Sequence, residues 1–292
     1  MRIVNFGSIN IDHVYFVDHF ARPGETISSA NYEHFSGGKG LNQSIALANS
    51  GAEVYHAGRI GRDGKWLRKR LESSGVNTKF VEVADVPSGH AIIQVNNEGE
   101  NCIVLYGGAN QCMTDSYVLQ VINQFSEGDY LLVQNEISSV PFILREAKRK
   151  GMVVIFNPAP MTPDVIHYPL ELVDILITNE LEAEGLTGEP IAEHAGTAML
   201  RKHPDITMVV TLGARGAVFF GPVGLLSQRA YEVKPVDTTA AGDTFVGFFI
   251  AAHMQGENPQ NCLERACRAA ALCITRKGAA DSIPHREELE EI

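Results

Sequence analysis

An aspartate at the start of a predicted helix lies where it could do chemistry. Residues 237–245 read DTTAAGDTF and follow an extended stretch at 231–236. The small residues at 240–242 would leave backbone N–H groups free at the start of the helix, where anions bind. Asp243 would then be either an acid that caps the helix or a general base beside an anion site. The local sequence alone slightly favours the capping role.

A second segment, residues 36–43, reads SGGKGLNQ and also opens a predicted helix. It has neither the GxxxxGK[ST] spacing of a phosphate-binding loop nor a GxGxxG fingerprint. Its glycines therefore predict only that a backbone or a ligand approaches closely. Lys39 and Asn42 would then direct donors at polar ligand groups. A tight loop with a solvent-facing Lys39 explains the same residues about equally well.

Polar or glycine-rich residues also follow several predicted strands: Asn10 and Asp12, Asn135 and Glu136, residues 179–182, and residues 211–216. Ligands of open α/β sheets bind beyond the carboxyl ends of the strands. Any one of these groups could be ordinary loop polarity. Their repetition along one chain favours a nucleotide or sugar cleft.

The elements that position these residues alternate between short apolar runs and amphipathic stretches. Predicted strands are 3–8, 54–60, 130–134, 153–157, 175–179 and 208–212, and predicted helices are 40–50, 64–74, 141–150, 191–203, 242–255 and 259–275. Strands separated by helices indicate βαβ units and a mostly parallel sheet. The strands show little alternation, as expected when helices cover both faces.

Two regions interrupt this rhythm, at about 14–35 and about 89–106. In the second, apolar runs at 91–95 and 102–106 flank the sequence NNEGE, which predicts a β-hairpin. Strands inserted into an α/β fold could form a small separate sheet that acts as a lid or a dimer surface. A simple extension of the main sheet is the plainer alternative.

Composition limits the class of protein. The 292 residues are 45 % hydrophobic, so we expect one domain over residues 1–292. The net charge of −11 argues against a nucleic acid or an anionic membrane as the main partner. Five cysteines without a CxxC predict buried free thiols rather than a disulfide framework. No apolar run approaches the length of a membrane span and the first residues resemble a strand, so we expect a cytoplasmic protein.

The motifs GGKGLN at 37–42 and DTTAAGD at 237–243 occur in order, with Asn179 and Glu182 between them. On these motifs the chain resembles the ribokinase-like (PfkB) carbohydrate kinase family over essentially its whole length. The resemblance implies a three-layer αβα fold with a mostly parallel central sheet and a small β-sheet lid. It also implies an ATP-dependent sugar kinase that uses Mg²⁺, is activated by K⁺ and forms a homodimer through the lid strands.

The resemblance implies roles for individual residues as well. Asp243 would be the general base, beside an anion hole formed by Ala240, Ala241 and Gly242. The matched sugar contacts are Asn10, Asp12, Gly38, Lys39, Asn42, Glu136 and Asp243. The nucleotide and its Mg²⁺ would lie near Asn179, Glu182, Thr211, Gly213, Gly216, Ala241, Gly242 and Cys267. The monovalent cation would lie among Asp237, Thr239, Cys273, Arg276, Gly278 and Ser282, several of them through backbone carbonyls.

Two residues depart from the family pattern: Ala240 replaces a common glycine, and Cys267 replaces a residue that is polar in some relatives. Because all the sugar-contact positions match, D-ribose is the expected substrate, with ribose 5-phosphate as the product. Kinases of the same family for fructose, deoxyribose or a nucleoside are alternatives. A non-catalytic binding protein of this fold would be expected to lack Asp243, and a dinucleotide oxidoreductase is disfavoured because GxGxxG is absent.

Overall fold

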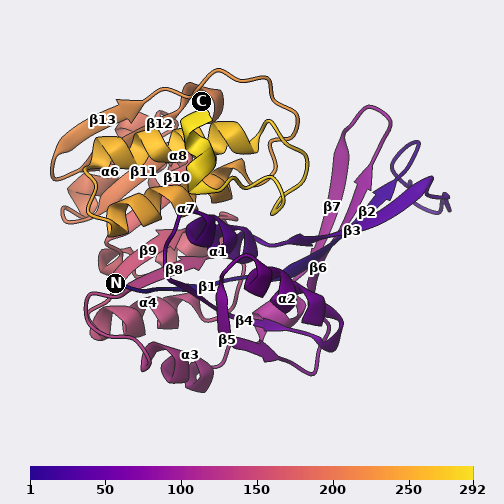
Figure 1. The fold of residues 1–292 in the computed structure, drawn as a ribbon, viewed down its shortest axis with the longest axis horizontal. Helices are drawn as coiled ribbons and strands as arrows, with labels where there is room; N and C mark the ends of the chain where they lie inside the picture. The colour runs from indigo at the N-terminus through magenta and orange to yellow at the C-terminus, as the bar shows by residue number, and fades with distance from the viewer. Residues whose placement is uncertain (292) are drawn as a thin grey trace.

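The body of the molecule is a nine-stranded sheet in the order β13-β12-β11-β10-β9-β8-β1-β4-β5, seen in a computed structural model that describes residues 1–291 (Figure 1). Neighbouring strands pair in parallel except at β12 and β13, which are antiparallel. The strands are β1 (Ile3–Phe6), β4 (Val54–Ile60), β5 (Asn77–Val83), β8 (Tyr130–Gln134), β9 (Val153–Asn157), β10 (Ile175–Asn179), β11 (Thr207–Thr211), β12 (Ala217–Gly221) and β13 (Gly224–Gln228).

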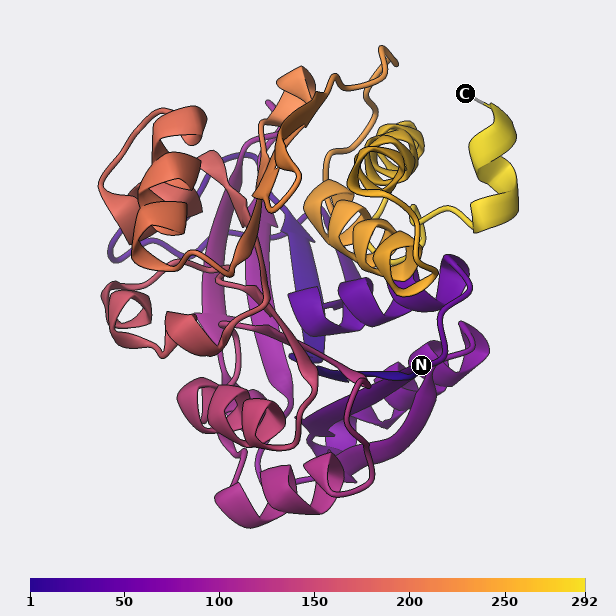
Figure 2. The same ribbon diagram turned by 90° about the vertical axis from the view of Figure 1, so that its left-hand side faces the viewer.

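Helices cover both faces of this sheet, which gives three layers (Figure 2). One face packs against α1 (Lys39–Asn49), α2 (Lys65–Ser73), α7 (Ala241–Met254) and α8 (Pro259–Cys273). The other face packs against α3 (Asp115–Ile122), α4 (Val140–Arg149), α5 (Glu180–Thr187) and α6 (Ala192–Lys202). Short 3₁₀ helices occupy Arg62–Gly64, Gly108–Gln111, Pro163–His167, Leu170–Leu172, Gly213–Arg215 and Arg286–Glu291. The expected three-layer αβα fold with a mostly parallel sheet is confirmed.

A second sheet forms the lid. Its strands are β2 (Asn10–Phe16), β3 (Asn31–Gly37), β6 (Gly89–Val95) and β7 (Asn101–Tyr106), in the order β3-β2-β6-β7. The four strands project away from the body (Figure 1). The first lid strand begins at Asn10 rather than near residue 14, and much of the expected 14–35 region is the connection between β2 and β3. Asn10 and Asp12 therefore lie on the lid itself and not in a loop after β1.

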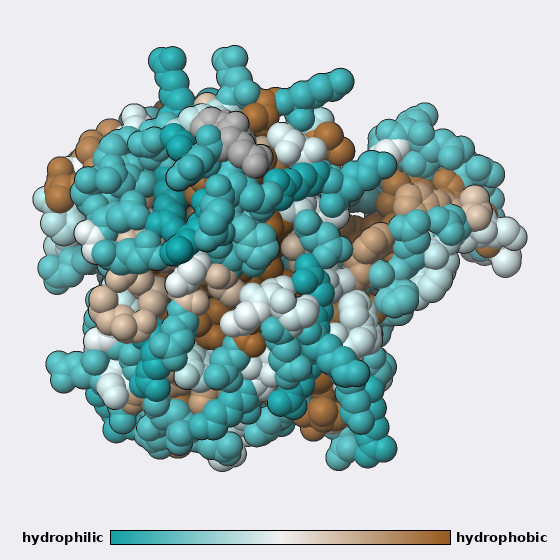
Figure 3. All heavy atoms as spheres, viewed as in Figure 1, coloured by the Kyte–Doolittle hydropathy of each residue, from teal (hydrophilic) through white to brown (hydrophobic). Residues whose placement is uncertain are grey.

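The lid strands leave apolar side chains uncovered. All the residues of β7 are exposed, and Val104 and Leu105 retain 63 % and 61 % of their possible exposure. Figure 3 shows hydrophobic residues on the visible surface of the lid, where it stands away from the body. Other exposed apolar residues of the lid are Tyr32, Phe35, Ile92, Ile103 and Tyr106.

All five cysteines are free, as expected, but they are not all buried. Cys262, Cys267 and Cys273 are buried, Cys112 is half-buried, and Cys102 is exposed on β7. The expectation of buried thiols is wrong for Cys102 because its strand belongs to the uncovered lid. Within residues 1–291, none of the helices combines the length and the apolar character needed to cross a membrane.

Candidate active site

Asp243 lies in the first turn of α7, at the carboxyl edge of the sheet. Two amides from α1 hold its carboxylate: Asn42 Nδ2 donates to Oδ2 at 2.9 Å, and Gln43 Nε2 donates to Oδ1 at 2.9 Å. The N-cap residue of α7 is Ala240, which offers no side-chain cap, and Asp243 is an acid in the first turn of the helix. The interpretation of Asp243 as a first-turn acid therefore still applies, and its carboxylate is in addition fixed by α1.

The start of α7 leaves room for an anion. Its first residue follows Ala240, which adopts a left-handed conformation with φ 60°. The first N–H groups of a helix have no carbonyl of their own helix to bind. A Cβ built on Gly242 would meet no atom within 4 Å, so the backbone there faces open space. Together with the helix dipole, this arrangement can accept negative charge beside Asp243.

The start of α1 is packed closely against the end of β1. A Cβ at Gly40 would lie 2.4 Å from Gly7 Cα and 2.3 Å from Ser8 N, so only glycine fits here. Glu136 Oε2 accepts hydrogen bonds from Ser8 Oγ at 2.5 Å and from the backbone N–H of Lys39 at 2.9 Å. Glu136, expected to contact sugar, thus also ties the loop after β8 to the start of α1.

Asp12 and Asn10 lie on β2 of the lid and face the start of α1. The Asp12 carboxylate lies over the backbone of Gly37, where a Cβ would approach Oδ2 to 2.0 Å. Burial, and then the nearby charge of Glu136, raise the pKa of Asp12 to about 6. Asn10 Oδ1 accepts a hydrogen bond from Asn110 Nδ2 at 2.7 Å, which fixes the orientation of its amide. Both side chains belong to the strand that joins the body to the lid.

Lys39 is the cation among these carboxylates. The charge of Asp243 is the main cause that raises the pKa of the Lys39 ammonium, with further contributions from Glu136 and Glu182, while burial opposes the rise. Burial raises the pKa of Glu182, and the charge of Asp243 adds to that rise. Lys39 therefore partly offsets three negative side chains that would otherwise repel a phosphate group.

Asn179 and Glu182 form a capping box at the start of α5. Asn179 Oδ1 accepts from the Glu182 N–H at 2.8 Å, and Glu182 Oε2 accepts from the Asn179 N–H at 2.9 Å. Within the described residues, no group of three or more His, Cys, Asp or Glu side chains is arranged to hold a metal ion. Glu182 supplies one carboxylate at this place, and Mg²⁺ is usually bound by one or two carboxylates together with phosphates and water.

The expected nucleotide loop follows β11. Thr211 Oγ1 donates to the carbonyl of Thr178 at 3.3 Å, which ties the ends of β10 and β11 together. A Cβ at Gly213 would meet no atom within 4 Å, whereas one at Gly216 would lie 1.9 Å from the carbonyl of Gln228. Gly213 therefore borders open space, and Gly216 is required by the tight turn into β12. Cys267 packs in the core of the α8 face, and burial raises its pKa to about 12.

Most residues expected around the monovalent cation come together. Asp237 Oδ1 accepts from the N–H and hydroxyl of Thr239 at 2.9 and 2.6 Å, and Oδ2 accepts from Gly278 N at 3.0 Å. Cys273 Sγ lies 3.1 Å from Ser282 Oγ. Arg276 differs, because its side chain turns away to pair with Glu288 at 2.6 Å. Only the backbone of Arg276 is thus free to face this cluster.

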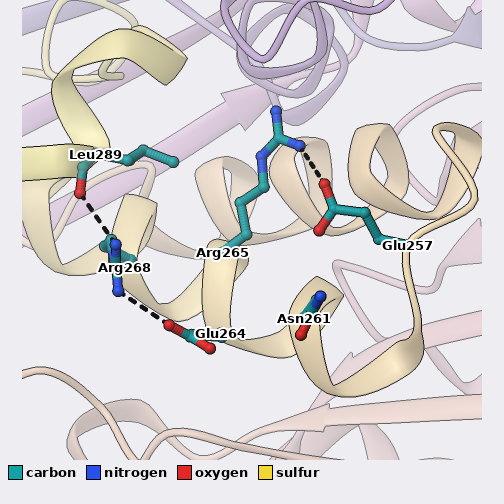
Figure 4. Close-up of a pocket in the computed structure, with 6 residues that line it drawn as sticks. All are labelled: Glu257, Asn261, Glu264, Arg265, Arg268 and Leu289. Atoms are coloured by element: carbon teal, nitrogen blue, oxygen red, sulfur yellow. Dashed lines mark hydrogen bonds and ion pairs between the residues drawn. The ribbon is translucent and has the colours of Figure 1, made fainter.

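Two pockets on the surface lie outside this constellation. One, of about 330 Å³, is lined by Glu257, Asn261, Glu264, Arg265, Arg268 and Leu289 (Figure 4). Its arginines are paired within the pocket, Arg265 with Glu257 at 2.8 Å and Arg268 with Glu264 at 2.9 Å, which leaves little charge for a ligand. The other, of about 440 Å³, is lined by residues 62–63 and 84–87. The residues of the candidate site come instead from the lid strand β2 and from the starts of α1 and α7.

Sequence reasoning missed several residues that shape the site. Gln43 holds the Asp243 carboxylate, Ser8 holds Glu136, Gly37 makes room for Asp12, and Asn110 orients Asn10. Gln43 and Gly37 lie inside the motif at 36–43, so their position could have suggested a role. Ser8 and Asn110 act through pairings that only the folded chain brings together.

The fold and the site define a class of protein: a three-layer α/β protein with a carboxylate at an open helix start and a small second sheet as a lid. The model of the pfkB family of carbohydrate kinases matches residues 1–286. The ribokinase of Haemophilus influenzae is 38 % identical over 98 % of this chain and 96 % of its own length. The structure of a ribokinase from Cryptococcus neoformans with ADP superposes with a TM-score of 0.87 at 34 % identity, covering 99 % of both chains.

A ribokinase from Arabidopsis thaliana, solved with ribose and ATP, superposes with a TM-score of 0.87 at 31 % identity. It covers 99 % of this chain and 97 % of its own. The chain belongs to the pfkB family of carbohydrate kinases. It is an ATP-dependent sugar kinase that uses Mg²⁺.

Proposed function

We propose that this enzyme transfers the γ-phosphoryl group of ATP to D-ribose, giving D-ribose 5-phosphate and ADP, with Asp243 as the general base. The observation that carries the proposal is the setting of the Asp243 carboxylate. It is held by Asn42 and Gln43 at the open start of α7, where base and anion site adjoin. The similarity to ribokinases over the whole chain supports ribose as the sugar.

In the proposed reaction the 5-hydroxyl oxygen of ribose forms a bond to the γ-phosphorus while the bond to the β–γ bridging oxygen breaks. Asp243 accepts the hydroxyl proton, a role that typically contributes ~10²–10⁴-fold to the rate. The N–H of Gly242, with the turn at Ala240, would stabilise charge on the transferring group. The Ala241 N–H, which donates to the Thr238 carbonyl at 3.3 Å, would join it by exchanging that long bond. The loss of one such donor typically costs ~10²–10³-fold.

The sugar would bind between the lid and the start of α1. Asp12 contributes an acceptor from β2, Asn10 contributes the Nδ2 donor that its bond to Asn110 leaves free, and Lys39 contributes a donor from α1. Within the described residues the buried Oδ1 of Asn42 has no hydrogen-bond partner, so it is an unsatisfied acceptor beside the proposed sugar site. Gly38 and Glu136 complete the proposed contacts. Closure of the lid over the sugar would exclude water, which otherwise competes for the phosphoryl group.

The nucleotide would lie over residues 211–216 and the start of α7, with Gly213 beside it and Asn179 and Glu182 near its phosphates. Mg²⁺ supplies charge neutralisation on the phosphates when it is bound. A role for the Cys267 side chain at the adenine is the least supported part, because the thiol is 5 % exposed within the core.

We also propose a K⁺ site at Asp237, Thr239, Cys273, Arg276, Gly278 and Ser282. The hydrogen bonds that Asp237 accepts from Thr239 and Gly278 support it, because they join the two loops directly before and beside the anion site. A cation there would act on the start of α7 through its charge. Activity should be higher in K⁺ than in Na⁺ buffer, and equal activity without K⁺ would contradict the site.

A homodimer through the lid is proposed because exposed apolar surface of this kind is usually covered by a partner. The free thiols, including the exposed Cys102, fit a reducing compartment, and we propose the cytoplasm.

The decisive experiment is a panel of sugars and nucleosides with ATP, monitored by coupled detection of ADP. D-ribose should give the highest kcat/KM, with phosphate on the 5-oxygen. A clear preference for fructose, deoxyribose or a nucleoside would instead assign the enzyme to another member of the family. No turnover with any sugar would favour a binding protein.

A further inference from the structure

A row of buried polar side chains crosses the α1 face of the sheet beneath Asp243. It consists of Asn157 on β9, Gln134 on β8, Asn5 on β1 and His56 on β4, four neighbouring strands in the sheet. All four residues are 7 % exposed or less, in a face otherwise filled by the apolar side chains of one core cluster. Polar groups at such positions cost stability unless they are hydrogen-bonded, so their bonding pattern is informative.

The direction of the hydrogen bonds is fixed at the far end of the row. His56 Nε2 lies 3.2 Å from the Gly7 carbonyl, which can only accept, so Nε2 carries the proton. Burial lowers the pKa of His56 to about 4, so the ring is neutral and Nδ1 accepts from Ser44 Oγ at 2.8 Å. Asn5 Nδ2 then donates to Ser44 Oγ at 2.9 Å and to the Gly40 carbonyl at 2.8 Å. The amide of Asn5 therefore has one possible orientation.

The orientation of the Asn5 amide determines that of Gln134, and Gln134 in turn determines that of Gln43. Gln134 Nε2 donates both of its hydrogens, to Asn5 Oδ1 at 2.9 Å and to Gln43 Oε1 at 2.6 Å. Gln43 must then turn its amino group toward Asp243 Oδ1 at 2.9 Å, with Asn157 Oδ1 as its second acceptor at 3.0 Å. Asn157 Nδ2 donates to the Ile177 carbonyl at 2.8 Å, which fixes the orientation of the Asn157 amide.

We infer that Gln134 and Gln43 are positioning residues for the general base: Gln134 fixes the amide of Gln43 so that it donates to Asp243. A Gln43 amide turned by 180° would place its oxygen against the carboxylate and repel it. The lock thus fixes one placement of the Asp243 carboxylate oxygens. The inference rests on the proposed role of Asp243. It also explains why Gln134 Oε1 remains buried without a partner, since its amino group is engaged twice.

The test replaces each glutamine by methionine, which keeps the length of the side chain and removes the donor. We expect Gln43→Met and Gln134→Met each to lower kcat by about tenfold to a hundredfold, the loss typical of a misplaced reacting group. The loss should appear in kcat, with KM for the sugar and KM for ATP nearly unchanged in both variants. Because Gln134 acts only through Gln43, the double variant should lose no more than Gln43→Met alone. Asn5→Val, one step further along the row, should have the same kind of effect but a smaller one.

The matched control is Asn49→Leu, in the same helix. Asn49 is a buried amide that donates to the Ile283 carbonyl at 3.1 Å and has no link to the row. It should lower thermal stability while leaving kcat unchanged. Unaltered kcat in folded Gln134→Met or Asn5→Val would overturn the inference, as would additive losses in the double variant. If Asp243→Asn also retains full kcat, the proposed function itself fails instead.

Discussion

Strands β8 and β7 have similar apolar sequences and opposite surroundings. β8 reads YLLVQ and all its residues are buried, whereas β7 reads NCIVLY and all its residues are exposed. The first lies in the middle of the nine-stranded sheet with helices on both faces. The second is an edge strand of the lid with no helix against it. Hydrophobic sequence thus predicts a strand in each case, but not whether the protein itself covers it.

The two sheets therefore contribute differently to the enzyme. The body has the packing that stabilises the fold, and it positions the base and the anion site. The lid has little packing of its own and contributes Asn10 and Asp12, the residues that would contact sugar. We expect substitutions in the body to affect stability and kcat, and substitutions in the lid to affect KM and association.

The largest contrast should appear in stability. Phe248 is fully buried in α7, so Phe248→Ala should lower the free energy of unfolding by about 3–5 kcal/mol. Leu105→Ala in the lid should change it by no more than about 0.5 kcal/mol. Urea unfolding at a protein concentration below that of dimer dissociation measures both. Similar losses in the two variants would remove the distinction between body and lid.

The next largest effect concerns catalysis. Asp243→Asn should lower kcat by ~10²-fold or more, because the amide cannot accept the sugar proton, with ATP binding and thermal stability nearly unchanged. Lys39 is the first residue of α1, directly after the lid strand β3. Lys39→Ala should instead raise KM for the sugar more than KM for ATP. Steady-state kinetics with each substrate varied separates the two. A kcat for Asp243→Asn within a few-fold of the parent rules out its role as base.

The carboxyl group of Asp12, on the lid strand β2, makes the stability of the protein depend on pH. Its pKa is raised to about 6 from 3.8, so the native state binds a proton more readily than the unfolded chain. Stability from this group is present at low pH and is lost as the pH rises through about 6. Asp12→Asn should therefore stabilise the protein at pH 7 by about 1–3 kcal/mol while weakening sugar binding. The gain in stability should disappear on acidification to about pH 4, and a gain independent of pH would contradict this origin.

The smallest effect on the folded chain should come from the lid surface. Leu105→Asp adds a charge to exposed apolar surface and should turn the proposed dimer into a monomer, with little change in the unfolding of the body. Light scattering at micromolar concentration measures the mass. A wild-type protein that is already monomeric, or a Leu105→Asp variant that stays dimeric, would show that this part of the lid does not form the interface.

The strands that the sequence predicts best are those buried on both faces: β4, β8, β9 and β10 have the expected limits. The edge strand β5 was not predicted, because its sequence NTKFVEV mixes apolar and polar residues where one side meets solvent. The motifs at 37–42 and 237–243 predict the start of α1 and α7 beside each other. They do not predict that Asn5 and Gln134 support them, because single polar residues within apolar strands give no signal before the strands are aligned.

The burial of α7 also bears on how the enzyme responds to ionic strength. From Thr244 to Ala252 every residue of this helix is buried, so counterions cannot gather along it. At 0.1 M, salt screens interactions between exposed charges that are more than about 10 Å apart. The net charge of −11 repels nucleotide phosphates over such distances, and salt weakens that repulsion. Added salt should therefore ease the approach of ATP, and at the exposed start of α7 it should also weaken the attraction of the helix dipole for phosphate.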